Sequence, residues 1–219
     1  ASVWMAALER FRPDIATACR AAFAVRQTDD KFVRPGRAEF AAVPNEAALR
    51  AASSRLFPGI LKVARFGYDG RGQAVVAERG EAIVAWQQFH GEICIVEQKL
   101  PLDGELSVLL ARDESGRIAS FPAVENSHRK GILDVSLVPA RATAELHRQA
   151  AELAATIAER LAYIGTLAVE FFIVGGDLVI NEMAPRPHNS GHYTLDACLS
   201  SQFEQQVRAL CGLPLGATD

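Results

Sequence analysis

The sequence predicts an α+β fold, in which strands joined by hairpins are mixed with helices. Its middle part holds short apolar or β-branched runs separated by Gly, Asp and Pro, which is typical of strands and turns. Apolar residues recur at three- and four-residue steps between Thr143 and Ile164, as on one face of a helix. Two more apolar runs flank Gly175-Gly176-Asp177, which predicts a hairpin. This mixture indicates the α+β class.

The expected elements follow one another along the chain. Residues 1–50 are rich in Ala and Arg with helix-like spacing, so we expect a helical leader of unknown role there. Asn45 is suited to cap a helix that stops near Ser53. Gly165 is expected to end the helix over 143–164, and a last helix is expected at Phe203–Leu210. The expected strands are 59–66, 73–78, 93–98, 105–112, 118–124, 132–138, 167–174 and 178–183.

Composition and charge narrow the functional classes. The chain has 219 residues, of which 49% are apolar, enough to fill a continuous core. Its formal net charge of −3 argues against a nucleic-acid partner, because non-specific binding needs a positive surface. Its apolar runs are too short for a membrane helix, so we expect no membrane partner. The four cysteines show no C-x-x-C spacing, which favours a reducing cytoplasm over a disulfide framework or a zinc cluster.

A lysine and a glycine-rich loop follow each other in the strand-rich part. Lys62 shares a strand face with Ile60 and Ala64, where an unpaired ammonium is costly, so it needs an anion nearby. The alternative is an edge-strand lysine whose head reaches water. The three glycines of GYDGRGQ (67–73) allow a tight turn with several N–H groups aimed at one point, as in a flap over phosphates. The alternative here is an ordinary flexible hairpin.

Polar residues also stand at the ends of two expected strands. Glu97 and Gln98 end a buried-looking run and offer donors and acceptors that suit the edge of a purine ring. Glu105 opens the next strand on the same face as Ser107, where a carboxylate could accept hydrogen bonds from ribose hydroxyls. For each glutamate, the alternative is a solvated strand end.

The expected hairpin brings two glutamates together. If residues 175–177 form a three-residue loop, Val174 pairs with Leu178, and Glu170 lies opposite Glu182. Opposed like charges on apolar strands are unfavourable unless something positive lies between them, and a magnesium ion held by carboxylates and phosphate oxygens meets this need. Asn181 could add an oxygen ligand or a phosphate contact. A two-residue turn is the alternative, and it would send the glutamates to opposite faces.

The segment 185–192, PRPHNSGH, concentrates hydrogen-bond donors. It holds a guanidinium, two imidazoles, an amide and a hydroxyl in a stretch stiffened by two prolines, which suits an anion. Its two histidines are four residues apart, but Pro187 and Gly191 argue against a helical zinc site. Cys198 has no evident base beside it, and no G-x-S-x-G is present, so nucleophilic catalysis is not expected.

Several motifs, taken in order, resemble the ATP-grasp part of the N5-carboxyaminoimidazole ribonucleotide synthetases of purine biosynthesis. They are Lys62, GYDGRGQ (67–73), VEQ (96–98), NSHRKGILD (126–134) and NEMAPRPHNSGHYTLDAC (181–198). The resemblance runs over roughly 160 residues, from Phe57 to Gly216. It implies an ATP-grasp fold, in which two α+β subdomains clamp ATP, and an ATP-dependent C–N ligase. In the family's reaction bicarbonate attacks the γ-phosphate to give carboxyphosphate, the amine of aminoimidazole ribonucleotide takes up the carboxyl group, and ADP and phosphate remain.

The resemblance also implies a role for individual residues. Magnesium would be held by Glu170 and Glu182. The implied ATP-binding residues are Lys62, Gly67, Tyr68, Asp69, Gly70, Arg71, Gly72, Gln73, Glu97, Gln98, Lys99, Leu100, Glu105, His128, Asn181 and Glu182. The residues implied to face aminoimidazole ribonucleotide and the bicarbonate-derived group are Tyr68, Arg71, Arg186, His188, Asn189 and Ser190. Of these, Arg186, His188 and Asn189 are the expected catalytic residues.

The same resemblance predicts the domain organisation. Residues 51–92 would form the small subdomain with the flap, and residues 93–219 the large subdomain with the adenine hinge and the magnesium site. Family members carry an N-terminal α/β domain and a small C-terminal domain, and we expect this chain to lack both. A truncated, non-catalytic ATP-binding fragment and another ATP-grasp carboxylate–amine ligase are therefore the alternatives. The expected partners are small molecules, and a homodimer is the assembly to test.

Overall fold

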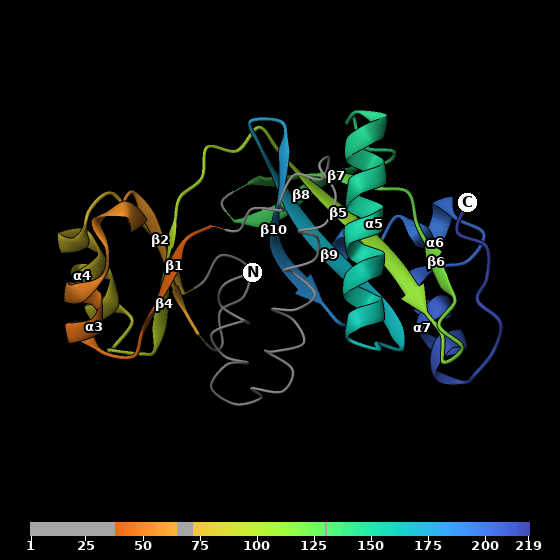
Figure 1. The fold of residues 1–219 in the computed structure, drawn as a ribbon, viewed down its shortest axis with the longest axis horizontal. Helices are drawn as coiled ribbons and strands as arrows, with labels where there is room; N and C mark the ends of the chain where they lie inside the picture. Colours follow the sequence, from red (N-terminus) through yellow and green to blue (C-terminus); the bar gives the residue numbers. More distant parts are fainter. Residues whose placement is uncertain (1–37, 65–71, 130) are drawn as a thin grey trace, which may run out of the picture. The chain divides into compact units, whose positions relative to one another are not determined.

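The described part of the chain forms two compact units (Figure 1). The structure is a computed structural model, and it describes residues 38–64, 72–129 and 131–219. Of these, 38–64, 72–101 and 131–132 belong to the first unit, and 102–129 and 133–219 belong to the second. The main division therefore falls after residue 101, whereas the sequence analysis places it after residue 92. Both units combine helices with antiparallel strands, which confirms the α+β class.

The first unit is built on a four-stranded sheet with the order β1-β4-β2-β3. The strand between positions 93 and 98 was expected in the second subdomain, but it pairs with two strands of the first unit. All three pairings in this sheet are antiparallel. The strands are β1 (Phe40–Val43), β2 (Gly59–Val63), β3 (Gln73–Val76) and β4 (Cys94–Gln98), and the helical elements are α3 (Glu46–Ala51), η1 (Ser54–Leu56) and α4 (Arg79–Gln88).

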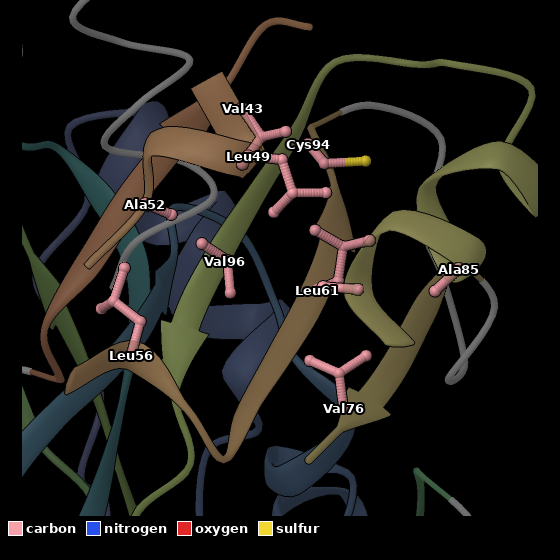
Figure 2. Packing of buried hydrophobic residues seen from close by; sticks show 10 residues of the cluster. Val43, Leu49, Ala52, Leu56, Leu61, Val76, Ala85, Cys94 and Val96 are labelled. Atoms are coloured by element: carbon pink, nitrogen blue, oxygen red, sulfur yellow. The ribbon is translucent and has the colours of Figure 1, made fainter. Parts of the chain in front are cut away.

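One face of this sheet packs against the helices. Figure 2 shows Leu61 of β2 and Val96 of β4 close to Leu49 of α3 and Ala85 of α4 in one apolar cluster. Leu61 and Val96 are register partners, so they lie on the same face of the sheet. Because side chains alternate along a strand, the neighbouring residues of β2 and β4 lie on the opposite face. That opposite face carries Lys62.

The structure adds elements that the sequence analysis does not predict. Helix α4 escapes a periodicity search because its buried residues, Ala82 and Ala85, are small, while Val84 is exposed. A helix whose buried face is made of alanine has little contrast between its faces. Strand β1 falls inside the expected helical leader, where Phe40–Val43 pairs with β4. Asn45 caps α3 as expected, since its Oδ1 accepts a hydrogen bond from Ala48 N.

The second unit contains a six-stranded sheet. Its path is β10-β9-β5-β7-β8, and β6 pairs with β5 beside this path. The central strand β5 is buried over the consecutive residues 106–111, so both faces of the sheet are covered there. The strands are β5 (Gly104–Arg112), β6 (Ile118–Ser120), β7 (Val124–Arg129), β8 (Ile132–Leu137), β9 (Gly165–Val174) and β10 (Asp177–Ala184).

Helices of the second unit pack against this sheet. Helix α5 (Ala144–Arg160) contacts β5, β9 and β10, and α7 (Gln202–Leu210) contacts β5 and β9 (Figure 1). Helix α5 ends four residues before the predicted end, and Gly165, with φ 124°, begins β9 instead of capping the helix. Two short elements, η2 (Asn189–Gly191) and α6 (Thr194–Ala197), follow β10. In the described ranges, no helix combines the length and apolar character needed to cross a membrane.

The β9–β10 hairpin corrects one expectation. Val174 pairs with Asp177, so the turn has two residues, Gly175 and Gly176, and the predicted three-residue loop is wrong. The register then shifts at a β-bulge between Ile180 and Glu182, so that Glu182 lies opposite Glu170. A bulge adds one residue to one strand and so reverses the sides of the residues beyond it. The predicted pairing of the glutamates is confirmed, although its predicted cause is not.

The core of the first unit generates a stability prediction. Leu61 is fully buried in the cluster of Figure 2, so Leu61→Ala should lower the free energy of unfolding by about 2–5 kcal/mol through lost apolar contact and the cavity left behind. Urea unfolding followed by circular dichroism measures this. Val75→Ala, at a residue of the same sheet that is 62% exposed, is the control. Equal losses in the two variants would contradict the assignment of this core.

Candidate functional site

The bulge in β10 places an acidic cluster on the sheet of the second unit. Glu170 of β9 and Glu182 of β10 are register partners across the hairpin. His188 comes from the segment after β10, and one ligand atom from each of these three residues lies within 4.8 Å of the other two. Carboxylate oxygens are the ligands that Mg²⁺ prefers, so the two glutamates form a candidate cation site.

The electrostatics of Glu170 agree with a missing positive charge. Its side chain is 13% exposed. Burial and then the nearby charge of Glu182 raise its pKa to about 7 from the usual 4.5. A carboxyl group in this position binds a proton because ionisation would place a second negative charge in a poorly solvated site. A bound divalent cation would remove that penalty, so the residues present fit a magnesium ion.

His188 is buried beside Glu170 and is kept neutral. Its Nε2 lies 3.6 Å from Glu170 Oε1. Burial, followed by the charges of Arg186, His192 and His128, lowers the pKa of His188 to about 4. A neutral imidazole cannot balance the charge of a carboxylate. The sequence analysis placed His188 with the substrate-facing residues and did not predict its contact with Glu170.

Asn181 occupies the bulge next to Glu182. Its Nδ2 donates a hydrogen bond of 3.4 Å to Glu170 Oε2. The amide therefore contacts one of the two glutamates, a contact that the sequence analysis did not predict. Its Oδ1 is the atom that could serve as a ligand or face a phosphate-bound cation.

A second polar pair lies on the same sheet. His128 Nδ1 of β7 lies 2.8 Å from Glu105 Oε2 of β5. The hydrogen bond to Glu105 is the largest cause that raises the pKa of His128, and the charges of Glu105, Glu170 and Glu182 add to it. Glu105 also lines a cavity of about 240 Å³ with Asp103, Glu125 and Arg141 among its walls. Glu105 is thus a carboxylate that contacts His128 and lines this cavity.

Three polar residues of this sheet were missed by the analysis of candidate sites. Ser107 is the register partner of Glu170. Asn126 Nδ2 donates a 2.6 Å hydrogen bond to Ser107 Oγ, and Asn126 Oδ1 accepts one of 3.1 Å from Ser136 Oγ. The burial of Ser107 and Asn126 is explained by these bonds, since buried polar groups need partners. Alternation along β7 places Asn126 on the same face as the buried Val124, and this is the signal that could have found it.

In the first unit, Lys62 has the anion that the sequence analysis required. Its Nζ donates a 3.1 Å hydrogen bond to Glu97 Oε2. Strand β2 lies between β4 and β3, so the edge-strand alternative for Lys62 is wrong. Glu97 is only 5% exposed, so a solvated strand end is also wrong. Its Oε1 has no hydrogen-bond partner among the described residues, and a buried acceptor of this kind suits a ligand donor.

The other predicted residues of the first unit have backbone contacts. Gln98 N donates to Glu39 O, and Lys99 N donates to Pro58 O; the half-buried Leu100 follows them. Gly72 has φ 73° and accepts a hydrogen bond from Val63 N. Gln73 is the register partner of Lys62. The remaining residues of the predicted flap, Gly67, Tyr68, Asp69, Gly70 and Arg71, lie outside the described residues.

The predicted substrate-facing residues after β10 divide into buried and exposed ones. Arg186 and Asn189 are exposed, whereas His188 and Ser190 are buried. Arg186 Nη1 donates to Pro187 O, and Asn189 Oδ1 accepts from Ser190 N. The two exposed side chains are therefore accessible. Of the two buried ones, His188 lies against Glu170 and Ser190 contacts the ring of His188.

Fold and sequence together identify the class of this chain. A family model of the ATP-grasp domain matches residues 34–203. The chain therefore belongs to the ATP-grasp family, as its resemblance predicted.

Its relatives are more specific. An N5-carboxyaminoimidazole ribonucleotide synthase of Bacillus subtilis (strain 168) is 44% identical over 199 residues, 89% of this chain and 52% of the relative. The crystal structure of an ADP complex of an N5-carboxyaminoimidazole ribonucleotide synthetase is 41% identical, with a TM-score of 0.83 over 95% of this chain and 53% of that one. A synthase of Aspergillus clavatus in complex with ADP and 5-aminoimidazole ribonucleotide is 26% identical, with a TM-score of 0.74 over 84% and 49% of the two chains. The chain thus spans about half the length of these relatives.

The buried glutamate generates a prediction about pH. Between about pH 5 and 7 the folded protein retains a proton on Glu170 that the unfolded chain has lost, so raising the pH through this window lowers the stability of the metal-free protein. Glu170→Gln removes this titration. Relative to the variant, the wild type should lose on the order of 1–3 kcal/mol of unfolding free energy between pH 5 and pH 8.

Urea unfolding in the presence of EDTA measures this difference. Glu159→Gln, at an exposed position of α5, is the control and should leave the pH profile of the wild type unchanged. Parallel pH profiles for the wild type and Glu170→Gln would show that Glu170 does not carry the effect.

Proposed function

We propose that the chain is the ATP-grasp part of an enzyme that carboxylates 5-aminoimidazole ribonucleotide with bicarbonate in purine biosynthesis, using ATP and releasing ADP and phosphate. The observation that carries the proposal is the acidic pair Glu170 and Glu182, opposed on neighbouring strands and within reach of His188, in a chain of the ATP-grasp family. Relatives that bear the name of this synthase support the substrate, and so does the relative that binds 5-aminoimidazole ribonucleotide.

In this proposal, Glu170 and Glu182 hold magnesium, with Asn181 beside them. When bound, the ion neutralises phosphate charge and orients the triphosphate. The role of the protein is to keep two carboxylates opposed at a fixed register. It also keeps His188 neutral through burial, so the imidazole does not compete as a cation for the carboxylates.

We assign the nucleotide contacts to residues of each unit. Lys62 would contact the phosphates with its ammonium. Glu97 Oε1, which has no hydrogen-bond partner among the described residues, would accept a hydrogen bond from the adenine amine, beside Gln98, Lys99 and Leu100. In the second unit Glu105 would accept from ribose hydroxyls at the edge of its cavity. His128, with its raised pKa, would add positive charge near the nucleotide. The predicted roles of residues 67–73 over the phosphates stay part of the proposal.

The segment after β10 would bind the other substrates. Arg186 and Asn189 are exposed and can present a guanidinium and an amide to bicarbonate and to the ribonucleotide. His188 and Ser190 are buried, and their predicted roles towards the same substrates, with His188 as a catalytic residue, stay part of the proposal. Catalysis in this arrangement consists of orienting the substrates and neutralising charge, because phosphoryl transfer from ATP to bicarbonate and carboxyl transfer to the amine need positioning more than covalent chemistry.

The cellular setting and the assembly are part of the same proposal. The cysteines in the described part of the chain, Cys94, Cys198 and Cys211, are free, which is consistent with a reducing cytoplasm. A homodimer stays a prediction that light scattering at several concentrations can test.

Phosphate release tests the proposed function directly. With ATP and Mg²⁺, release should require both bicarbonate and 5-aminoimidazole ribonucleotide, because each is consumed in the proposed reaction. Glycinamide ribonucleotide as the acceptor is the control for another carboxylate–amine ligase. Release that is the same with ATP alone would contradict the proposal, and ATP binding without any release would select a non-catalytic nucleotide-binding chain.

Lys62 provides a separate prediction about ATP affinity. Lys62→Met removes a charged contact to the phosphates and should weaken ATP binding by about 1.5–3 kcal/mol, roughly ten- to a hundredfold in Kd. Lys62→Arg keeps the charge and should retain most of the affinity. Calorimetry measures both, at a temperature where circular dichroism shows both variants folded. An unchanged Kd in folded Lys62→Met would remove Lys62 from the nucleotide contacts.

A further inference from the structure

The amide of Gln202 clamps the backbone of His188. Gln202 is the first residue of α7 and is fully buried. Its Oε1 accepts a 2.8 Å hydrogen bond from His188 N, and its Nε2 donates a 2.8 Å hydrogen bond to His188 O. A buried amide is tolerated only when its polar atoms have partners. Here one residue supplies both partners, so the side chain fixes the position of that residue.

The backbone of Gln202 is itself tied to the strand that carries Glu170. Thr166 Oγ1 of β9 donates a 2.9 Å hydrogen bond to Gln202 O. Thr166 and Glu170 are four residues apart on one strand and so point to the same face. Gln202 N donates to Thr194 Oγ1, which in turn donates to Gly191 O. The contacts run from β9 through Gln202 to His188.

Gly191, in the turn after His188, packs closely against the amide of Gln202. A Cβ at Gly191 would lie 2.6 Å from Gln202 Oε1, so only glycine fits there without a shift. His188 therefore has little freedom to move away from the amide that holds it.

The ring of His188 is also held by hydrogen bonds, through its Nδ1. Ser190 N can only donate, and it lies 3.4 Å from His188 Nδ1, with Ser190 Oγ at 2.9 Å from the same atom. Ser190 N also donates to Asn189 Oδ1 at 3.0 Å. With Nδ1 as the acceptor of its bond from Ser190 N, the ring proton is on Nε2, the atom that faces Glu170 Oε1 at 3.6 Å. A ring held by its other nitrogen presents a fixed tautomer to its partner.

We propose that Gln202 is a positioning residue of the candidate site: its amide holds the His188 backbone at the height where the Nε2–H of the imidazole meets Glu170. The effect of Gln202 on catalysis rests on the proposed function, whereas its effect on the position of His188 does not. Gln202 does not touch the acidic pair, and it acts on the site through His188. Partners that orient residues around a metal site in this way typically change metal affinity or activity by roughly 10- to 100-fold when removed.

The chain contains a matched control on the same helix. Gln205 is also fully buried, and it makes the same kind of amide-to-backbone pair, since its Nε2 donates to Gly216 O and its Oε1 accepts from Gly216 N. Gln202→Met and Gln205→Met each remove such a pair from a buried position while keeping the side-chain length. A general loss of packing would affect the two variants alike.

The first measurement needs no ligand. Long-range ¹H–¹⁵N spectra of the imidazoles should show the Nε2–H tautomer for His188 in the wild type and in Gln205→Met. In Gln202→Met, the His188 signals should move towards the average of the two tautomers. Unchanged His188 signals in folded Gln202→Met would overturn the proposal. If Gln202→Met does not fold, Thr194→Val takes its place under the same criterion. This variant removes the hydrogen bonds of Thr194 Oγ1 to Gln202 N and to Gly191 O.

The second measurement concerns the reaction. Gln202→Met should lower kcat for phosphate release by roughly 10- to 100-fold, with a smaller change in KM for ATP, and Gln205→Met should keep the wild-type kcat. Equal kcat values in the two variants would also count against the positioning role. If the wild-type chain releases no phosphate, the proposed function fails, and the imidazole spectra alone still decide the role of Gln202.

Discussion

The opposed carboxylates of Glu170 and Glu182 are the constraint on which the second unit depends. Burial of Glu170 and then its repulsion by Glu182 on the neighbouring strand raise the pKa of Glu170, which records the cost of placing it there. The surrounding sheet offsets that cost with the continuous buried run of β5 and the helices packed on it. Function and stability therefore oppose each other at this point: the arrangement that suits a divalent cation weakens the metal-free protein.

The sequence analysis predicted correctly that Glu170 lies opposite Glu182, but it did not predict the turn and the bulge that bring them together. The prediction counted residues outward from a three-residue loop, but the turn has two residues, and a bulge at Asn181 restores the face of Glu182. Counting residues cannot detect a bulge, because it results from competition between local backbone geometry and the packing of both strands. The polar Asn181 within an apolar strand is the only trace it leaves. For Lys62 the sequence analysis left an edge strand open. The structure places it on an inner strand, where the ammonium contacts Glu97.

Helices whose faces differ little in hydrophobicity, and buried polar side chains, were not predictable from the sequence. Helix α4 buries alanines, so its faces differ too little for a periodicity signal, whereas the leucine and isoleucine pattern of α5 predicted that helix well. The burial of Gln202, Gln205 and Asn126 was equally hidden. Glutamine and asparagine are usually exposed, and only the tertiary structure shows which backbone groups they satisfy. The sequence thus predicts the charged residues of the site better than the neutral residues that hold them.

The two units treat their buried carboxylates differently, and under the proposed function this difference marks where magnesium would bind. In the first unit Glu97 contacts the ammonium of Lys62 at 3.1 Å, a group that is charged at neutral pH, so the protein itself supplies the balancing charge. In the second unit the base that lies against Glu170 is His188, whose pKa is lowered to about 4 by burial and by neighbouring positive groups. A neutral imidazole can donate a hydrogen bond but cannot balance a charge. Among the described residues, the charge of His128 offsets only part of the penalty at Glu170, whose pKa is still raised to about 7. Under the proposed function, a bound cation would complete the balance that a proton provides in its absence.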